Sequence, residues 1–233
     1  MSITCWEPKN IKCKSPLNTD TKCEDMLCSM IKTIEVIGLA GINYLIPNPN
    51  NFEDLIVNTE KSLKEILNAC DNCVIKDCTS VICCIAQAIG VIGASGLTAI
   101  AQQPGLYDSI TTYTQLLIDA MYLKVNCLNK NVNCTSVICC ISQAIGVIGA
   151  SGLTAISQKP VVYDKITTYT KLLINSMYSQ VNCLNKNVNC EDIQCCIAQA
   201  IAVIDFSSSI TDTNEKIELY VVYLKKQINI NCK

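Results

Sequence analysis

The chain has 233 residues, half of them apolar, so it is long enough to bury a hydrophobic core. A net charge of -2 and the absence of arginine, the best two-point reader of phosphate and guanine, argue against a nucleic-acid partner. Histidine is also absent, which removes the commonest general base and metal ligand, so we expect neither an enzyme nor a bound cofactor.

Residues 1–22 predict an irregular N-terminal cap, because Pro8, Pro16 and several turn-forming residues interrupt any periodic pattern. The chain starts without the basic segment and apolar core of a secretory signal peptide, so either a signal has been removed and a start Met added, or the protein reaches an oxidising site without one. We also expect no transmembrane segment, because the longest apolar runs are interrupted by Gln, Ser, Thr and Gly.

One unit then recurs four times, with a period close to 56 residues. Cys78–Ile100 and Cys134–Ile156 are identical at 22 of 23 positions, and Asn126–Cys134 recurs as Asn182–Cys190. A more divergent copy starts at Cys23. We therefore predict repeats at residues 23–77, 78–133, 134–189 and 190–233. The first and last are more charged, which is typical of capping repeats.

Each repeat predicts two helices, of which the first is buried. An Asn-rich loop precedes it, and Thr135 and Ser136 offer N-cap oxygens. Apolar residues lie on all its sides, which is typical of a helix inside a core. Gly146, Gly149 and Gly152 lower its helix propensity but leave a bare strip, which indicates close contact with a neighbouring helix.

The second helix follows a proline break and is amphipathic. In the third repeat Tyr163, Ile166 and Leu173 fall on one face, and the helix is expected to end at Cys183, as its counterpart ends at Cys127. The predicted fold is therefore all-α, with four stacked, disulfide-stapled αα-hairpin repeats. A β fold is the alternative, because the first segments contain β-branched runs, but the period of 3.6 residues favours helices.

Eighteen cysteines at repeated spacings predict a disulfide framework and an oxidising, extracellular environment. The candidate bridging residues are Cys28, Cys70, Cys73, Cys83, Cys84, Cys127, Cys134, Cys139, Cys140, Cys183, Cys190, Cys195, Cys196 and Cys232.

In a hairpin, the start of the first helix lies beside the end of the second. We therefore expect one of Cys139 and Cys140 to bond Cys183, and the other to reach a loop cysteine such as Cys134, or another chain. Adjacent helical residues point about 100° apart, so the two cannot share one partner. The same reasoning pairs Cys83 or Cys84 with Cys127, Cys195 or Cys196 with Cys232, and Cys28 with Cys70 or Cys73.

The sequence gives weaker support for a nucleotide site, a redox site or a zinc site. Gly90, Gly93 and Gly96 do not match the dinucleotide fingerprint and are expected to be packing residues. The Cys70-x2-Cys73 spacing lacks the βαβ context of a redox site, so a structural bridge is expected there. A zinc site formed by Cys190, Cys195 and Cys196 is the alternative to disulfides.

The cysteine order from Cys78 to Cys183, C…CC…C…C…CC…C, resembles that of hydrophobins in order alone; hydrophobins are β-rich, unlike the helices expected here. The Asn-, Ile- and Lys-rich, arginine-free, cysteine-dense chain is similar in general character to spore-coat and exosporium proteins of clostridia. That resemblance implies a structural protein that binds copies of itself in a disulfide-cross-linked coat, lattice or fibre. A secreted carrier of a hydrophobic ligand and a secreted effector or silk-gland protein are the alternatives.

Overall fold

The structure is a computed structural model that describes residues 23–68, 75, 78–123, 125, 132–179, 183, 190–210 and 214–229. Within these residues the chain is all-helical, with eight α-helices and no strand, so the all-α prediction is confirmed and the β alternative is wrong. The expected cap at residues 1–22 lies outside the described residues.

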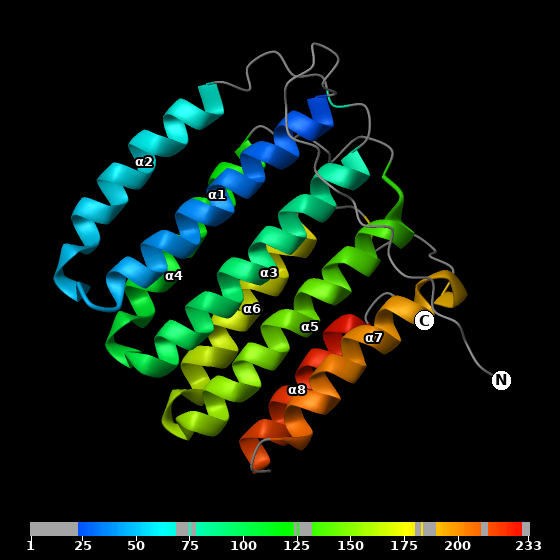
Figure 1. The fold of residues 1–233 in the computed structure, drawn as a ribbon. Helices are drawn as coiled ribbons and strands as arrows, with labels where there is room; N and C mark the ends of the chain where they lie inside the picture. Colours follow the sequence, from blue (N-terminus) through cyan, green and yellow to red (C-terminus); the bar gives the residue numbers. More distant parts are fainter. Residues whose placement is uncertain are drawn as a thin grey trace.

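The odd-numbered helices form one layer of the molecule, the nearer one in Figure 1, which we call the upper layer. Each packs against the next along the chain, in the order α1 (Cys23–Leu45), α3 (Cys78–Gln102), α5 (Cys134–Gln158) and α7 (Cys190–Ser209). These helices begin at equivalent cysteines of the sequence repeats, and their starts lie at one edge of the layer.

The even-numbered helices form the lower layer: α2 (Phe52–Asn68), α4 (Tyr107–Leu123), α6 (Tyr163–Ser179) and α8 (Glu215–Ile228). Three of them, α4, α6 and α8, contact both the upper helix just before them in the chain and the upper helix before that. Each of these three therefore sits in the furrow between two upper helices and joins one repeat to its predecessor.

Local sequence signals explain most helix boundaries. Short 3₁₀ turns at Pro49–Asn51, Pro104–Leu106 and Pro160–Val162 precede α2, α4 and α6, because proline suits the first turn of a helix. The helix α5 is capped by Asn133, whose side chain accepts a hydrogen bond from the Ser136 amide at 3.2 Å. The expected capping by Thr135 or Ser136 is therefore wrong, since both lie inside the first turn.

The second helices end before the predicted cysteines. The helix α4 ends at Leu123 and α6 at Ser179, whereas Cys127 and Cys183 were the expected ends. After α4, the Val125 amide donates to the Tyr122 carbonyl at 2.9 Å, a tight turn that takes the chain out of the helix.

The two central upper helices, α3 and α5, form the middle of the hydrophobic core. Each is long and apolar enough to span a membrane, with mean hydropathies of 1.9 and 1.8. Within the fold, 72% and 61% of these apolar stretches are buried against other helices. The core helix of a globular protein has the same properties, so composition alone assigns neither helix to a membrane.

Candidate functional site: a disulfide ladder across the repeats

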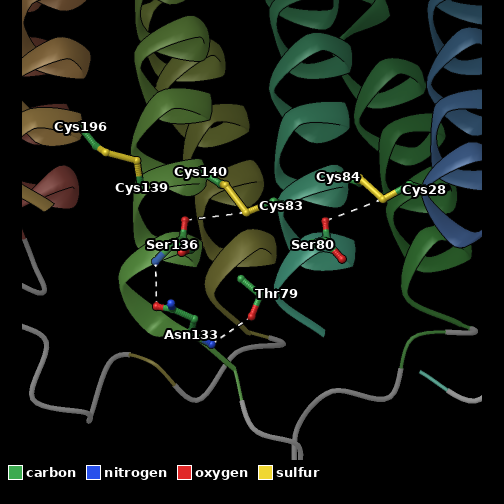
Figure 2. The surroundings of a disulfide bond; sticks show 10 residues. All are labelled: Cys28, Thr79, Ser80, Cys83, Cys84, Asn133, Ser136, Cys139, Cys140 and Cys196. Atoms are coloured by element: carbon green, nitrogen blue, oxygen red, sulfur yellow. Dashed lines mark hydrogen bonds between the residues drawn. A yellow bond between two sulfur atoms is a disulfide. The ribbon is translucent and has the colours of Figure 1, made fainter. Parts of the chain in front are cut away.

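Three disulfide bonds join neighbouring upper helices at equivalent positions (Figure 2). They are Cys28–Cys84 between α1 and α3, Cys83–Cys140 between α3 and α5, and Cys139–Cys196 between α5 and α7. The bonded Cα atoms lie 5.7, 5.3 and 5.3 Å apart, in the ordinary range for protein disulfides. The bonds form a ladder that links all four upper helices covalently.

The adjacent cysteines serve two different neighbours. In α3 and α5 the first cysteine of the pair bonds to the next upper helix and the second bonds to the preceding one. Two successive helical residues point about 100° apart, which allows one pair to reach both flanks of its helix. The first helix has Ser29 at the second position, and no upper helix precedes it in the part of the chain that the structure describes.

The predicted staple between Cys183 and Cys139 or Cys140 is wrong. The structure bonds Cys183 to Cys134, the first residue of α5, with Cα atoms 5.4 Å apart. After α6 the chain returns to the level of the α5 start, whereas Cys139 and Cys140 lie about 7 to 9 Å further along the helix axis at 1.5 Å per residue. They face the neighbouring upper helices, in their own layer.

The structure also corrects the other predicted pairings, apart from that of Cys195 with Cys232, because Cys232 lies outside the described residues. Cys28 bonds to Cys84, and not to Cys70 or Cys73. Cys83 and Cys84 each bond to a neighbouring repeat, and not to Cys127, while Cys196 bonds to Cys139, and not to Cys232.

The remaining cysteines are only partly described. Cys23, Cys78 and Cys195 are also in disulfides. Cys70, Cys73, Cys127 and Cys232 lie outside the described residues, as does the side chain of Cys190. Since Cys195 and Cys196 are oxidised, two of the three thiolates of the alternative zinc site are already used. Among the described residues, no group of three Cys, Asp or Glu side chains is placed to hold a metal ion.

A hydrogen bond reinforces the ladder at the helix starts (Figure 2). The backbone amide of Asn133, the residue that caps α5, donates to the Thr79 hydroxyl of α3 at 3.0 Å. One asparagine therefore caps its own helix and ties it to the preceding repeat. Sequence reasoning missed this contact, although Asn before Cys134 and Cys190 was a visible signal of an N-cap.

A buried tyrosine locks each later repeat onto its predecessor. The hydroxyls of Tyr169 and Tyr220 form hydrogen bonds of 2.7 Å with Thr114 and Thr170 on the preceding lower helices. Tyr113 makes the equivalent bond to Thr59 at 3.3 Å and donates to the Ile37 carbonyl at 3.1 Å. Burial raises the pKa of Tyr113, Tyr169 and Tyr220, which keeps these phenols protonated.

The glycine strip of each upper helix receives these side chains. A Cβ atom on Gly41, Gly96 or Gly152 would overlap the hydroxyl of Tyr113, Tyr169 or Tyr220, respectively. One turn earlier, a Cβ atom on Gly149 would lie 2.7 Å from Leu224. The glycines that sequence analysis assigned to packing therefore contact two different neighbours. Gly93 and Gly96, like Gly149 and Gly152, form a socket for a Tyr and a Leu side chain of the next repeat, which we call the plug, whereas Gly90 and Gly146 face Ala144 and Ala200 of the next upper helix. No nucleotide loop forms in these helices.

The socket and the plug are both altered at the ends of the array. In the last repeat Asp205, Ser208 and Val221 occupy the positions of Gly149, Gly152 and Thr170. Asp205 pairs with Lys225 at 2.6 Å. In the first repeat Asn58 and Ser62 replace the plug residues Tyr113 and Leu117. Neither end presents the apolar complement that a further repeat needs.

Two grooves lie on the lower layer. One, of about 390 Å³, runs between α2 and α4 and is mostly apolar, with Leu63, Leu67, Leu116, Ala120 and Leu123 in its walls. The other, of about 490 Å³, lies between α4 and α6 and is more polar, with Gln115, Asp119, Ser176 and Ser179 among its residues. Both are open to the surface.

Comparisons with known proteins find no relative. No protein-family model, no curated protein and no solved structure matches the chain.

Proposed function

We propose that the protein is a structural protein, a disulfide-reinforced slab that assembles with copies of itself into a protective coat, lattice or fibre. The favoured location is a spore surface, where in this proposal an oxidising environment keeps the disulfides formed. The observation that carries the proposal is the disulfide ladder. It gives the upper layer a second covalent path beside the main chain, which suits a protein that has to resist denaturation more than one that has to change shape.

The outer surface of the upper layer supports self-association. Neither α3 nor α5 contains a charged residue. Gln87, Val91 and Thr98 on α3 recur as Gln143, Val147 and Thr154 on α5, and all six are at least partly exposed. We call these six residues the uncharged face. A flat, repeated surface without charge can meet a second copy without burying unpaired ions, which is the costly part of forming an interface.

The lower layer has a different outer surface. Asp108, Asp164, Lys165 and Lys171 lie on the outer sides of α4 and α6, where they remain in contact with water. Charge on this side favours solvent over another protein layer. Together with the altered ends of the array, this favours contact between copies through the uncharged face over end-to-end continuation of the repeats.

Charge substitution on the uncharged face tests this proposal. We expect the purified protein to form sheets or filaments that resist denaturant until reductant is added. Val147→Glu places a carboxylate on the face at a residue that is 46% exposed and should leave a folded monomer. Val161→Glu, at a 77% exposed residue outside the face, is the matched control and should assemble normally.

Negative-stain microscopy and analytical ultracentrifugation read the result. The proposal fails if the unmodified protein stays monomeric at every concentration, or if both variants assemble equally well.

A hydrophobic-ligand carrier is the second candidate, and the groove between α2 and α4 favours it. Its volume of about 390 Å³ is at the small end of the range for ligand pockets, and its walls are mostly apolar. Native mass spectrometry of the purified protein tests this function directly. A bound lipid that is lost in the Ala120→Trp variant, which fills the groove, would establish the carrier function. An unliganded monomer mass would exclude it.

A further inference from the structure

The last upper helix carries an apolar stripe on its outer side. Val203 and Phe206 on α7 and Ile210 directly after it follow one another at steps of three and four residues, a spacing that places side chains on one face of a helix. They are 44%, 69% and 70% exposed. We call these three residues the apolar stripe. Large exposed apolar side chains that gather on one face are typical of an interaction surface.

The disulfide ladder determines which way the apolar stripe faces. Cys196 bonds to the preceding upper helix, as its equivalent Cys140 does. The helix α7 therefore has the same rotation about its axis as α5. Because Val203 is the equivalent of Val147, the apolar stripe continues the uncharged face across α7, at the edge of the upper layer (Figure 1).

The opposite edge of the same surface is polar. On α1, Val36 is the equivalent of Val91 and is 63% exposed. Lys32 and Asn43 stand at the positions that Gln and Thr occupy on α3 and α5. Lys32 pairs with Glu35 at 2.7 Å. The outer surface of the upper layer therefore changes from an ion pair at α1 to a wholly apolar stripe at α7.

The upper layer has the area that a stable pair of copies needs. Its helices contain 20 to 25 residues. At a rise of about 1.5 Å per residue and three spacings of about 8 to 10 Å, the layer covers roughly 700 to 1,100 Å². A stable protein interface takes about 800 Å² from each partner. The apolar stripe alone is smaller than that, so a stable contact has to extend over the uncharged face as well.

Charge distinguishes the two ways in which two such faces can meet about a two-fold axis. If α7 lay against α1 of the second copy, Phe206 would cover the ion pair of Lys32 and Glu35, and these charges would lose water without gaining a partner. With α7 against α7, the apolar stripes cover each other and the charges lie at the rim. An apolar centre and a polar rim are the usual arrangement of protein interfaces.

We propose that two copies pair with their upper layers face to face, and that α7 of one copy lies against α7 of the other. Such a contact is isologous, since the same surface of each copy meets its own counterpart. The pair rests on the proposed self-assembly and is its building unit.

Opposite charges at one position test the pairing. In the proposed contact the Phe206 side chains of the two copies meet, so Phe206→Glu and Phe206→Lys should each give a folded monomer, because like charges would face each other. An equimolar mixture of the two variants should restore the pair. Val222→Glu, at a 65% exposed residue of α8 in the lower layer, is the matched control and should pair like the unmodified protein. Sedimentation velocity measures the species, and circular dichroism verifies the helical fold.

Each other outcome overturns the proposal. Pairing of both Phe206 variants on their own would show that α7 is outside the contact, although self-assembly itself would stand. Pairing of Phe206→Glu alone would place α7 beside the Lys32 side chain of the second copy. Two monomeric variants whose mixture does not pair would show that α7 meets a different surface.

An unmodified protein that stays monomeric would refute the proposed self-assembly as well as the pair. If that monomer floated with phosphatidylcholine vesicles and Phe206→Glu did not, the apolar stripe would belong to a membrane contact instead.

Discussion

At the scale of single residues, the contact between repeats is a small set of complementary positions. A tyrosine and a leucine from one repeat enter a strip of glycines on the preceding one, and a threonine pairs with the tyrosine hydroxyl. The same set occurs at all three junctions between repeats. Because the interior is close-packed, adding even a methyl group to this socket should be costly.

Gly96→Ala tests the socket. The added Cβ atom would overlap the hydroxyl of Tyr169, a fully buried side chain that has no room to move. We expect the free energy of unfolding to fall by about 1 to 3 kcal/mol, as for other overpacked cores. Gly105→Ala, where an added Cβ meets nothing within 4 Å, is the control and should change stability by less than about 0.5 kcal/mol. Equal stability of the two variants in guanidinium titrations would contradict the socket.

Phenol ionisation tests the tyrosine lock. Burial raises the pKa of the three tyrosines of the lock, Tyr113, Tyr169 and Tyr220, above the ordinary value of 10.0. Since the folded state then holds protons that the unfolded state releases, the contribution of these tyrosines to the free energy of unfolding should be fully present below pH 10 and fall as pH rises further. Absorbance at the phenolate band should show exposed tyrosines ionising first, and these three only as the protein unfolds. Ionisation of all nine tyrosines in one step near pH 10 in the folded protein would contradict the burial.

At the scale of helices, sequence patterns predicted the features that repeat along a single helix. They missed the features that depend on which helices lie beside it. The buried first helix and the glycine strip were predicted because one helix shows its own periodicity. The pairing of Cys139 and Cys140 was not, because it depends on which helices flank α5. Sequence reasoning stated correctly that adjacent cysteines diverge, but it placed one partner in the same hairpin and did not assign the two flanks to two neighbouring repeats.

The Thr and Tyr partnership was missed for a related reason. Thr114 and Tyr169 are 55 residues apart, and nothing in either local pattern links them. Only a comparison of repeats shows that Thr59, Thr114 and Thr170 are equivalent and that the last repeat has Val221 at this position. The replacement of this threonine by valine in the last repeat was the signal in the sequence that could have revealed the pairing.

Removal of single ladder bonds should loosen single helices. The Cys139→Ser and Cys196→Ser double variant lacks the ladder bond between α5 and α7, which joins two residues 57 apart in the sequence. We expect a loss of stability of about 2 to 5 kcal/mol and faster amide hydrogen exchange in α7 and α8, with α1 and α3 unchanged. The Cys28→Ser and Cys84→Ser variant should show the reverse pattern, with faster exchange in α1. Uniformly faster exchange along the chain in both variants would argue against a segmental role for each bond.

At the scale of the whole molecule, the outer faces of the first and last repeats differ chemically from the junctions between repeats. Polar residues occupy the plug positions of the first repeat, and an ion pair occupies the socket of the last. The two central repeats are nearly identical and carry both plug and socket. Repeat number is therefore adjustable in the middle of the chain and fixed at its ends.

Deletion of residues 134–189 tests this modularity. The cut removes one whole period, so the socket of α3 meets the plug of α8, and Cys83 meets Cys196 in place of Cys140. We expect a folded, helical protein of three repeats with a new Cys83–Cys196 bond, identified by peptide mapping. Deletion of residues 134–161, half a period, is the control and should not fold. A full-period deletion that is also unfolded would show that the repeats are not equivalent units.

The disulfide ladder itself is the central claim, and mapping of the native bonds tests it most directly. The oxidised protein is digested without reduction, and electron-transfer fragmentation separates the contributions of adjacent cysteines. We predict Cys28–Cys84, Cys83–Cys140 and Cys139–Cys196, each joining neighbouring repeats, with Cys134–Cys183 inside one repeat. A bond from Cys183 to Cys139 or Cys140 would contradict the ladder. It would show instead that adjacent cysteines form bonds within their own hairpin.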